Sequence, residues 1–217
     1  MSTYVLMRIF ESSANRYDWG IRFLTFGKLD ALYDELTAYV GKGQTVLDVG
    51  CGTGALTCRA ARKGAFVKGI DINPEMLEIG RKRVEAENLI DRVVLSEMGI
   101  AELDSEPAES FDIVMSGLCF SELTEAELAF ALKHIRRILK TNGLLLVADE
   151  IIPGNWLKRI LLRMVRLPVV VLTYLLTQTS THPLKNFADQ IESNGFLIET
   201  SKRNFAGDFI GIIARKT

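Results

Sequence analysis

The chain has 217 residues, of which 48% are hydrophobic and 24% are charged, and its formal net charge is −1. These values are typical of one globular domain with a sizeable core, and they exclude a disordered polyelectrolyte. A balance this close to neutral also disfavours a nucleic-acid partner, because phosphate binding usually requires a basic surplus.

The cysteines and the N-terminal segment indicate the compartment. Cys51, Cys58 and Cys119 form no CxxC pair, and the chain has 2 histidines, so no metal site is expected. An odd and sparse cysteine content favours a reducing environment. The N-terminal segment lacks a long apolar stretch with a small-residue cleavage site, so no signal peptide is expected. We therefore expect a cytoplasmic protein without a metal cofactor.

From residue 44 onward, short apolar runs alternate with helical patterns. Buried strands are expected at 44–50, 65–72, 91–97, 110–118 and 144–150. Helices are expected between them at 55–64, 73–89 and 121–143. Asn73 is suited to cap the second helix, with Pro74 in its first turn, and Asn142-Gly143 should end the third. This alternation predicts right-handed crossovers and a parallel sheet covered by helices on both faces.

The C-terminal part departs from the alternation. A helix is expected at 182–195, followed by strands at 196–204 and 208–216. A connection of about four residues is too short for a parallel crossover, so the last strand must run antiparallel to its neighbour. We expect a single α/β, Rossmann-like domain over residues 1–217 with seven strands, a helical lid at 1–42 and a cap insertion at 152–183.

The glycine-rich segment VLDVGCGTG follows the first strand and opens a helix. Gly50, Gly52 and Gly54 allow a ligand to approach the backbone closely, and the helix start offers unpaired N–H groups. Asp71 ends the second strand, where a carboxylate accepts from both hydroxyls of a ribose. A glycine turn between a strand and a helix, combined with an acid at the end of the next strand, predicts a nucleoside ligand.

Glycine spacing and Asp48 distinguish between two kinds of nucleoside. A dinucleotide site needs G-x-G-x-x-G so that the pyrophosphate can meet the helix, whereas this turn reads G-x-G-x-G. Asp48 would repel a pyrophosphate. It suits the ammonium of an amino acid, either directly, through water, or by orienting the glycine turn. The pattern favours S-adenosylmethionine over NAD.

Four segments resemble class I S-adenosylmethionine-dependent methyltransferases in their order and spacing over residues 44–150: VLDVGCGTGALT, GIDINPEML, SFDIVMSGL and LKTNGLLLVADE. The closing helix and strands resemble the reversed seventh strand of that family. The most similar large subgroup is the ubiquinone/menaquinone-biosynthesis type. The flanks RYDWGIRFLTFGKLDALYDEL and LTYLLTQTSTHPLKNF resemble corrinoid-protein-associated methyltransferases.

This resemblance implies that S-adenosylmethionine is the cofactor and S-adenosylhomocysteine its product. It assigns the methionine end to Asp48, Gly50, Cys51, Gly52 and Gly54, the ribose to Asp71, and the adenine to Ile72 and Met76. One departure concerns the adenine amino group, because the family often has an aspartate after the third strand and this chain reads EMGIAEL. The expected replacements are backbone groups around Ile100 and Ala101, or the side chain of Glu97 or Glu102.

The acceptor pocket is expected beyond the carboxyl ends of the fourth and fifth strands, where this class of fold binds ligands. Methyl transfer is an in-line displacement that depends on orientation, and it needs a general base only if the acceptor loses a proton. Glu150 and His182 are the candidate catalytic residues. Ser116 is expected beside the cofactor, and the expected pocket residues are Tyr17, Cys119, Glu122, Tyr174 and Gln178. Glu122 is interpreted either as a base or as the start of the following helix, where acids complement the helix dipole.

The apolar stretch at 166–184 is too short to span a membrane and is interrupted by Pro168. We interpret it as the inner face of a cap that selects the acceptor. The basic amphipathic pattern at 155–166 indicates either peripheral contact with a membrane or acidic partner, or a solvated helix that covers the core.

Three functions are compatible with these patterns. The first is methyl transfer to an apolar or bulky acceptor, either a corrinoid cofactor or corrinoid protein, or a quinone-like small molecule methylated at carbon or oxygen. The second is a non-catalytic S-adenosylmethionine-binding assembly protein. The third, an NAD(P)-linked reductase, is disfavoured by the glycine spacing. No pattern indicates the oligomeric state.

Overall fold

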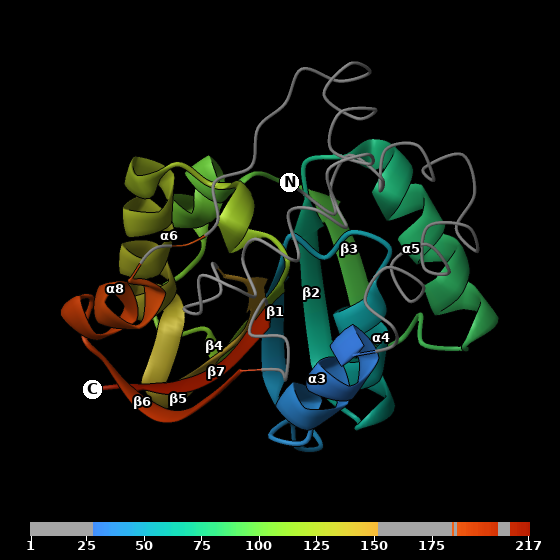
Figure 1. Cartoon of the computed structure of the whole chain (residues 1–217). Helices are drawn as coiled ribbons and strands as arrows, with labels where there is room; N and C mark the ends of the chain where they lie inside the picture. The colour runs from blue at the N-terminus through green and yellow to red at the C-terminus, as the bar shows by residue number, and fades with distance from the viewer. Residues whose placement is uncertain (1–27, 152–183, 185, 204–208) are drawn as a thin grey trace, which may run out of the picture.

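A computed structural model describes residues 28–151, 184, 186–203 and 209–217, and Figure 1 shows its elements around one central sheet. The sheet has seven strands in the order β3-β2-β1-β4-β5-β7-β6. Their bounds are β1 Thr45–Val49, β2 Phe66–Asp71, β3 Val93–Glu97, β4 Phe111–Gly117, β5 Leu139–Glu150, β6 Phe196–Arg203 and β7 Phe209–Lys216. Neighbouring strands from β3 to β5 pair in parallel, and β7 runs antiparallel to both β5 and β6. The expected Rossmann-like sheet with a reversed last strand is therefore confirmed.

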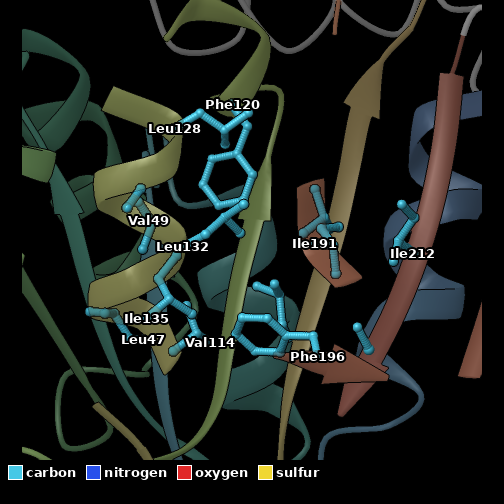
Figure 2. Packing of buried hydrophobic residues seen from close by; sticks show 14 of the residues in the cluster. Leu47, Val49, Val114, Phe120, Leu128, Leu132, Ile135, Ile191, Phe196 and Ile212 are labelled. Carbon is cyan, nitrogen blue, oxygen red and sulfur yellow. The ribbon is translucent and has the colours of Figure 1, made fainter. Parts of the chain in front are cut away.

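Helices cover both faces of the sheet. One face carries α3 Lys28–Thr37, α4 Ala55–Arg62 and α5 Pro74–Ala86; the other carries α6 Glu125–Ile138 and α8 Phe187–Ser193. Because side chains alternate along a strand, β1 sends Val46 into the first layer and Leu47 and Val49 into the second. Figure 2 shows the second layer, where α6 places Leu128, Leu132 and Ile135 against the sheet. In the described part of the chain, both faces of the central strands are thus withdrawn from water, which leaves the strand ends open to ligands.

Capping residues decide where two of the helices begin. The Asn73 side chain accepts from the N–H groups of Glu75 and Met76, which confirms the expected start of α5. In α6, Thr124 Oγ1 accepts from Glu127 N at 3.3 Å, and Glu127 Oε2 accepts from Thr124 N at 2.8 Å. This reciprocal capping box fixes the helix start at residue 125, so the expected start at 121 is wrong.

The end of α6 also differs from the expectation. The helix stops at Ile138, and Leu139 already pairs with Phe111 as the first residue of β5. Asn142 has φ 62 and lies within an irregular part of the β4–β5 pairing. Asn142 and Gly143 therefore turn the chain inside a strand rather than ending a helix, and both residues favour such conformations.

Of the predicted lid at 1–42, residues 28–42 are described, and they include a core helix. α3 packs against α4, β5 and β7. Its apolar stripe of Leu29, Tyr33 and Leu36 is buried, so this part of the expected lid belongs to the helical layer. The remaining lid residues and the cap insertion at 152–183 lie outside the described residues. In the described part of the chain, no helix has both the length and the apolar character needed to cross a membrane.

Candidate functional site

An open cavity of about 1250 Å³ lies at the carboxyl ends of β1, β2 and β4. Its walls come from the glycine turn after β1, the β2–α5 connection, the 3-10 turn η1 Ile100–Ser105, the 3-10 turn η2 Phe120–Glu122, and the first turns of α3. These segments are distant in the sequence. The topology brings them together because all parallel strands point their carboxyl ends at the same edge.

The glycine turn forms the floor of the cavity. Gly50 and Gly52 have φ values of 69° and 51°, in the left-handed region that favours glycine. A β-carbon at Gly50 would lie 2.5 Å from Cys119 Sγ, so the residue must also be small. The N–H groups of Gly50 and Cys51 both donate to Ile70 O at 2.9 Å, which ties the turn to β2. Gly50, Cys51 and Gly52 line the cavity, whereas Gly54 is buried as the residue preceding α4.

Asp71 connects the glycine turn with the next wall. Its Oδ2 accepts from Gly52 N at 2.8 Å and its Oδ1 from Asn73 N at 2.9 Å. Burial raises the pKa of this carboxyl above its ordinary value, although these backbone bonds oppose the shift. A carboxylate has about four acceptor positions, so Asp71 retains acceptor capacity on the cavity side. That arrangement suits a pair of vicinal hydroxyls.

The wall beside Asp71 is apolar. Ile72 lines the cavity and is 74% exposed, whereas Met76, which also lines it, is 6% exposed. Ile100 and Ala101 line the same wall from η1. Exposed apolar side chains at the edge of a cavity gain most from a flat apolar ligand. Glu102 Oε1 accepts from Gly99 N at 3.0 Å, and neither Glu102 nor Glu97 lines the cavity.

Two residues expected at the cofactor are buried behind the cavity wall. Asp48 is 1% exposed; its Oδ2 accepts from Thr57 Oγ1 at 2.6 Å, and its Oδ1 has no hydrogen-bond partner among the described residues. Burial raises the pKa of Asp48 to about 7. Ser116 is fully buried and donates to Val49 O at 3.0 Å. Ser116 therefore joins β4 to β1 and is not part of the wall, while Asp48 joins β1 to Thr57 of α4.

The acceptor side of the cavity is formed by η2 and the start of α6. Cys119 and Glu122 line it, together with the apolar side chains of Leu118, Leu123 and Phe130. Glu122 lies in η2, before the Thr124 cap of α6, so its interpretation as the first turn of that helix is wrong.

The environment of Glu122 favours its neutral form. Burial, with added repulsion from Asp149 and Asp71, raises the pKa of Glu122 to about 8. Its side chain is nevertheless exposed to the open cavity, so water there moderates the shift and a bound acceptor would strengthen it. Glu122 is therefore a group whose protonation changes within the neutral to weakly basic range.

The two acids at the end of β5 have different positions. Asp149 is fully buried, and its Oδ2 accepts from the N–H groups of Phe120 and Ser121. Glu150 is half-buried, donates its N–H to Asp149 Oδ1 at 2.7 Å, and is not among the cavity-lining residues. Asp149, and not the predicted catalytic residue Glu150, is therefore the acid of β5 that contacts η2. The catalytic role of Glu150 stays a prediction.

Tyr33 is a cavity residue that the sequence analysis did not identify. It belongs to α3, its ring lies beneath the Arg59 guanidinium, and a β-carbon at Gly117 would overlap its hydroxyl. Burial and the charges of Asp48 and Asp149 raise its pKa, so the phenol keeps its proton. A tyrosine in a helix before the first strand carries no sequence signal for this role.

Four predicted residues, Tyr17, Tyr174, Gln178 and His182, lie outside the described residues, and their roles stay predictions. Within the described ranges, no group of three or more His, Cys, Asp or Glu side chains could hold a metal ion. The described walls offer groups that suit an S-adenosyl ligand: a glycine turn that a ligand can approach closely, the Asp71 carboxylate and the exposed side chain of Ile72.

Comparison with known proteins agrees with this geometry. The sequence model of the family described as "Methyltransferase domain" matches residues 46–143. Demethylmenaquinone methyltransferase of Tropheryma whipplei is 38% identical over 111 residues, covering 51% of this chain and 43% of its own length. Ubiquinone/menaquinone biosynthesis C-methyltransferase UbiE of Vibrio vulnificus is 32% identical over 149 residues, covering 65% of this chain and 55% of its own length. The chain thus spans about half the length of these curated relatives.

A solved structure supports the fold. The S-adenosylmethionine-dependent methyltransferase of Aquifex aeolicus superposes with a TM-score of 0.62 at 18% identity, over 87% of this chain and 89% of that one. At this identity the likeness concerns the fold alone. Residues 46–143 thus carry the sequence of a methyltransferase domain, and the described chain has the Rossmann-like methyltransferase fold.

Proposed function

We propose that the protein is an S-adenosylmethionine-dependent methyltransferase whose acceptor is a small molecule methylated at carbon or oxygen. The observation that carries the donor assignment is Asp71, which is bonded to the glycine turn and lies beside the exposed Ile72. The relatives that match the chain are named as methyltransferases, two of them of quinone biosynthesis.

The described residues divide the work of such a reaction. Gly50 and Gly52 would hold the methionine part, Asp71 the ribose, and Ile72 with Met76 the adenine. When bound, S-adenosylmethionine supplies a methyl group on a sulfonium, which leaves S-adenosylhomocysteine after in-line displacement.

Glu122 is the described residue best placed to take a proton from the acceptor. In the proposed step, the carboxylate accepts a proton from an acidic C–H or O–H group, and the electron pair thus released forms the new bond to the methyl carbon. The S–CH₃ electron pair stays on sulfur. Leu118, Leu123 and Phe130 would surround the acceptor with apolar surface and limit its contact with water.

A corrinoid acceptor is the alternative derived from the flanking segments, which lie mostly outside the described residues. Reduced cobalt is itself a nucleophile and needs no base. An ionisable Glu122 in the acceptor wall therefore favours an acceptor that must lose a proton. The two curated relatives reported above are named for methylation of demethylmenaquinone and for ubiquinone/menaquinone biosynthesis, which points in the same direction.

Transfer of labelled methyl from S-adenosylmethionine tests the proposal, with a demethylated quinone precursor and a reduced corrinoid offered as separate acceptors. Because Glu122 must be ionised to accept a proton, the rate should rise as the pH passes about 8. Glu122→Gln should lose about 10²–10⁴-fold in kcat/KM and keep its affinity for S-adenosylhomocysteine. Glu125→Gln, at an exposed position in the first turn of α6, is the matched control.

The outcomes separate the alternatives. Labelling of the corrinoid alone, with no effect of Glu122→Gln, would overturn the acceptor assignment. Tight binding of S-adenosylhomocysteine without transfer to any acceptor in a cell extract would instead support a non-catalytic binding protein. Absence of binding by calorimetry would overturn the donor assignment.

A further inference from the structure

Asp149 is completely buried, yet it contacts the acceptor wall through the backbone. It lies near the end of β5 and pairs with Ile210 of β7. Its Oδ2 accepts from Phe120 N at 2.8 Å and Ser121 N at 3.2 Å, and its Oδ1 accepts from Glu150 N at 2.7 Å. Hydrogen bonds from backbone N–H groups to a charged carboxylate are stronger than neutral ones. One side chain therefore fixes the first two residues of η2.

The segment that Asp149 holds has an unfavourable backbone conformation. Leu118, which connects β4 to η2, has φ 59, a value that a branched side chain rarely adopts. Such a conformation persists only when the surrounding structure over-determines it. Leu118 N donates to Ala148 O at 2.8 Å, and Asp149, the next residue of β5, binds the following N–H groups.

The fixed segment has a buried side and a cavity side. Phe120 is fully buried beside Leu128, as Figure 2 shows, and meets Phe187 edge-on at 6.1 Å between ring centroids. Cys119 and Glu122 flank the segment 120–121, and both line the cavity. A shift of the turn would therefore move both cavity residues together.

We propose that Asp149 is a positioning residue for methyl transfer, holding η2 so that Cys119 and Glu122 form the acceptor wall. The inference rests on the proposed function, in which Glu122 accepts the proton. Asp149 itself does not contact the cavity, so it acts through the turn and through its charge.

Charge provides a second link between the two acids. Repulsion from Asp149 contributes to the raised pKa of Glu122, after the larger contribution from burial. Burial raises the pKa of Asp149 itself to about 6, against the opposing hydrogen bonds from Ser121, Glu150 and Phe120. At neutral pH Asp149 is therefore mostly charged and keeps Glu122 protonated to a higher pH.

Other titratable groups near these two acids are Tyr33 from α3, Cys119 immediately before η2, and Asp71 and Asp48 from the ends of β2 and β1. Burial raises the pKa of Tyr33 and of Cys119, so both stay protonated over the pH range used for the test.

Asp149→Asn and Asp149→Ala, made in the full-length protein, separate geometry from charge. Asparagine keeps an acceptor oxygen and removes the charge, so we expect the acidic limb of the kcat/KM profile to move to lower pH. Alanine removes both bonds to η2 and the bond from Glu150 N, and we expect kcat/KM to fall about 10²-fold, as it does when a reacting group is misplaced by about 1 Å. The affinity for S-adenosylhomocysteine should stay unchanged in Asp149→Asn, because this variant keeps η2 in place and leaves Asp71 and the glycine turn untouched.

A second measurement does not depend on turnover. Amide hydrogen exchange at Phe120 and Ser121 should accelerate roughly tenfold or more in Asp149→Ala, since each lost bond involves a charged acceptor. Asp112→Asn is the matched control: it is another β-strand carboxylate that accepts from Thr45 N at 2.8 Å and Thr45 Oγ1 at 2.8 Å, and it does not line the cavity.

The results distinguish this inference from the proposed function. Unchanged exchange at 120–121 in Asp149→Ala would overturn the positioning role even if the enzyme proves to be a methyltransferase. Faster exchange in a protein that methylates neither acceptor would retain the structural role and overturn the proposed function. If Asp149→Ala does not fold, Asp149→Asn still decides, since an unshifted pH profile with normal exchange would overturn the inference.

Discussion

Replacing Asp48 by asparagine should stabilise the ligand-free protein and weaken its binding of S-adenosylmethionine. The carboxyl is 1% exposed, and its Oδ1 has no hydrogen-bond partner among the described residues. Burial outweighs the hydrogen bonds from Thr57 and raises its pKa from 3.8 to about 7. At neutral pH the folded protein thus holds a carboxylate in surroundings that favour the neutral acid.

The magnitude follows from proton linkage. Between pH 3.8 and about 7 the folded protein binds this proton more tightly than the unfolded chain, so its stability falls as the pH rises through that window. A shift of about three pH units corresponds to roughly 4 kcal/mol, which applies fully above pH 7. An asparagine amide without an acceptor offsets about 1–3 kcal/mol of this. We therefore expect Asp48→Asn to increase the free energy of unfolding by about 1–3 kcal/mol at pH 8, and not at pH 4.5.

Urea denaturation of both proteins at pH 4.5 and 8 measures this effect, with Asp91→Asn as an exposed control. Calorimetry with S-adenosylmethionine at pH 8 measures the loss of affinity. An equal stability difference at the two pH values would refute the raised pKa of Asp48. Undiminished affinity would refute its support of the methionine end.

Three further predictions concern other parts of the site. Asp71→Asn should weaken binding of S-adenosylhomocysteine about 10–100-fold in calorimetry, because it removes charge-assisted hydrogen bonds; equal affinity would exclude Asp71 as the ribose ligand. Gly117→Ala should lower the free energy of unfolding by about 1–3 kcal/mol through overpacking against the Tyr33 hydroxyl. Adding Tyr33→Phe should restore part of that loss, and strict additivity in the double-mutant cycle would contradict the contact. Thr124→Ala should lower the free energy of unfolding by about 1 kcal/mol through loss of the helix cap. A lower thermal midpoint would show this loss, and the pH profile of methyl transfer should stay unchanged.

Local sequence signals accounted for most of the sheet and the donor side of the cavity. Apolar runs predicted the central strands β1 and β4 to within two residues, because strands buried on both faces must be almost continuously apolar. The helix α5 was predicted with its cap, since Asn73 and Pro74 act on their immediate neighbours. The glycine turn and Asp71 were likewise identified together, because their separation is fixed by one strand–helix–strand unit.

Predictions that depended on distant contacts were less accurate. The sequence pattern extended α6 across 121–143, whereas pairing of Leu139 with Phe111 ends the helix early. Ser116 was expected beside the cofactor, but the alternation along β4 turns it toward Val49. The lid was expected to include residues 28–42, but the apolar stripe of α3 is buried by helices and strands that follow it in the chain.

The amino-acid sequence by itself determined the succession of strands and helices along the chain, the reversed last strand, and the nucleoside-binding turn. These features depend on periodicity and short-range spacing. Only the tertiary structure decided the acceptor side. It placed Tyr33 against Gly117, separated Glu122 from α6, and buried Asp149 beneath η2. These contacts join segments that are about 30 to 85 residues apart in the chain, and their pKa shifts arise from burial that no local pattern encodes.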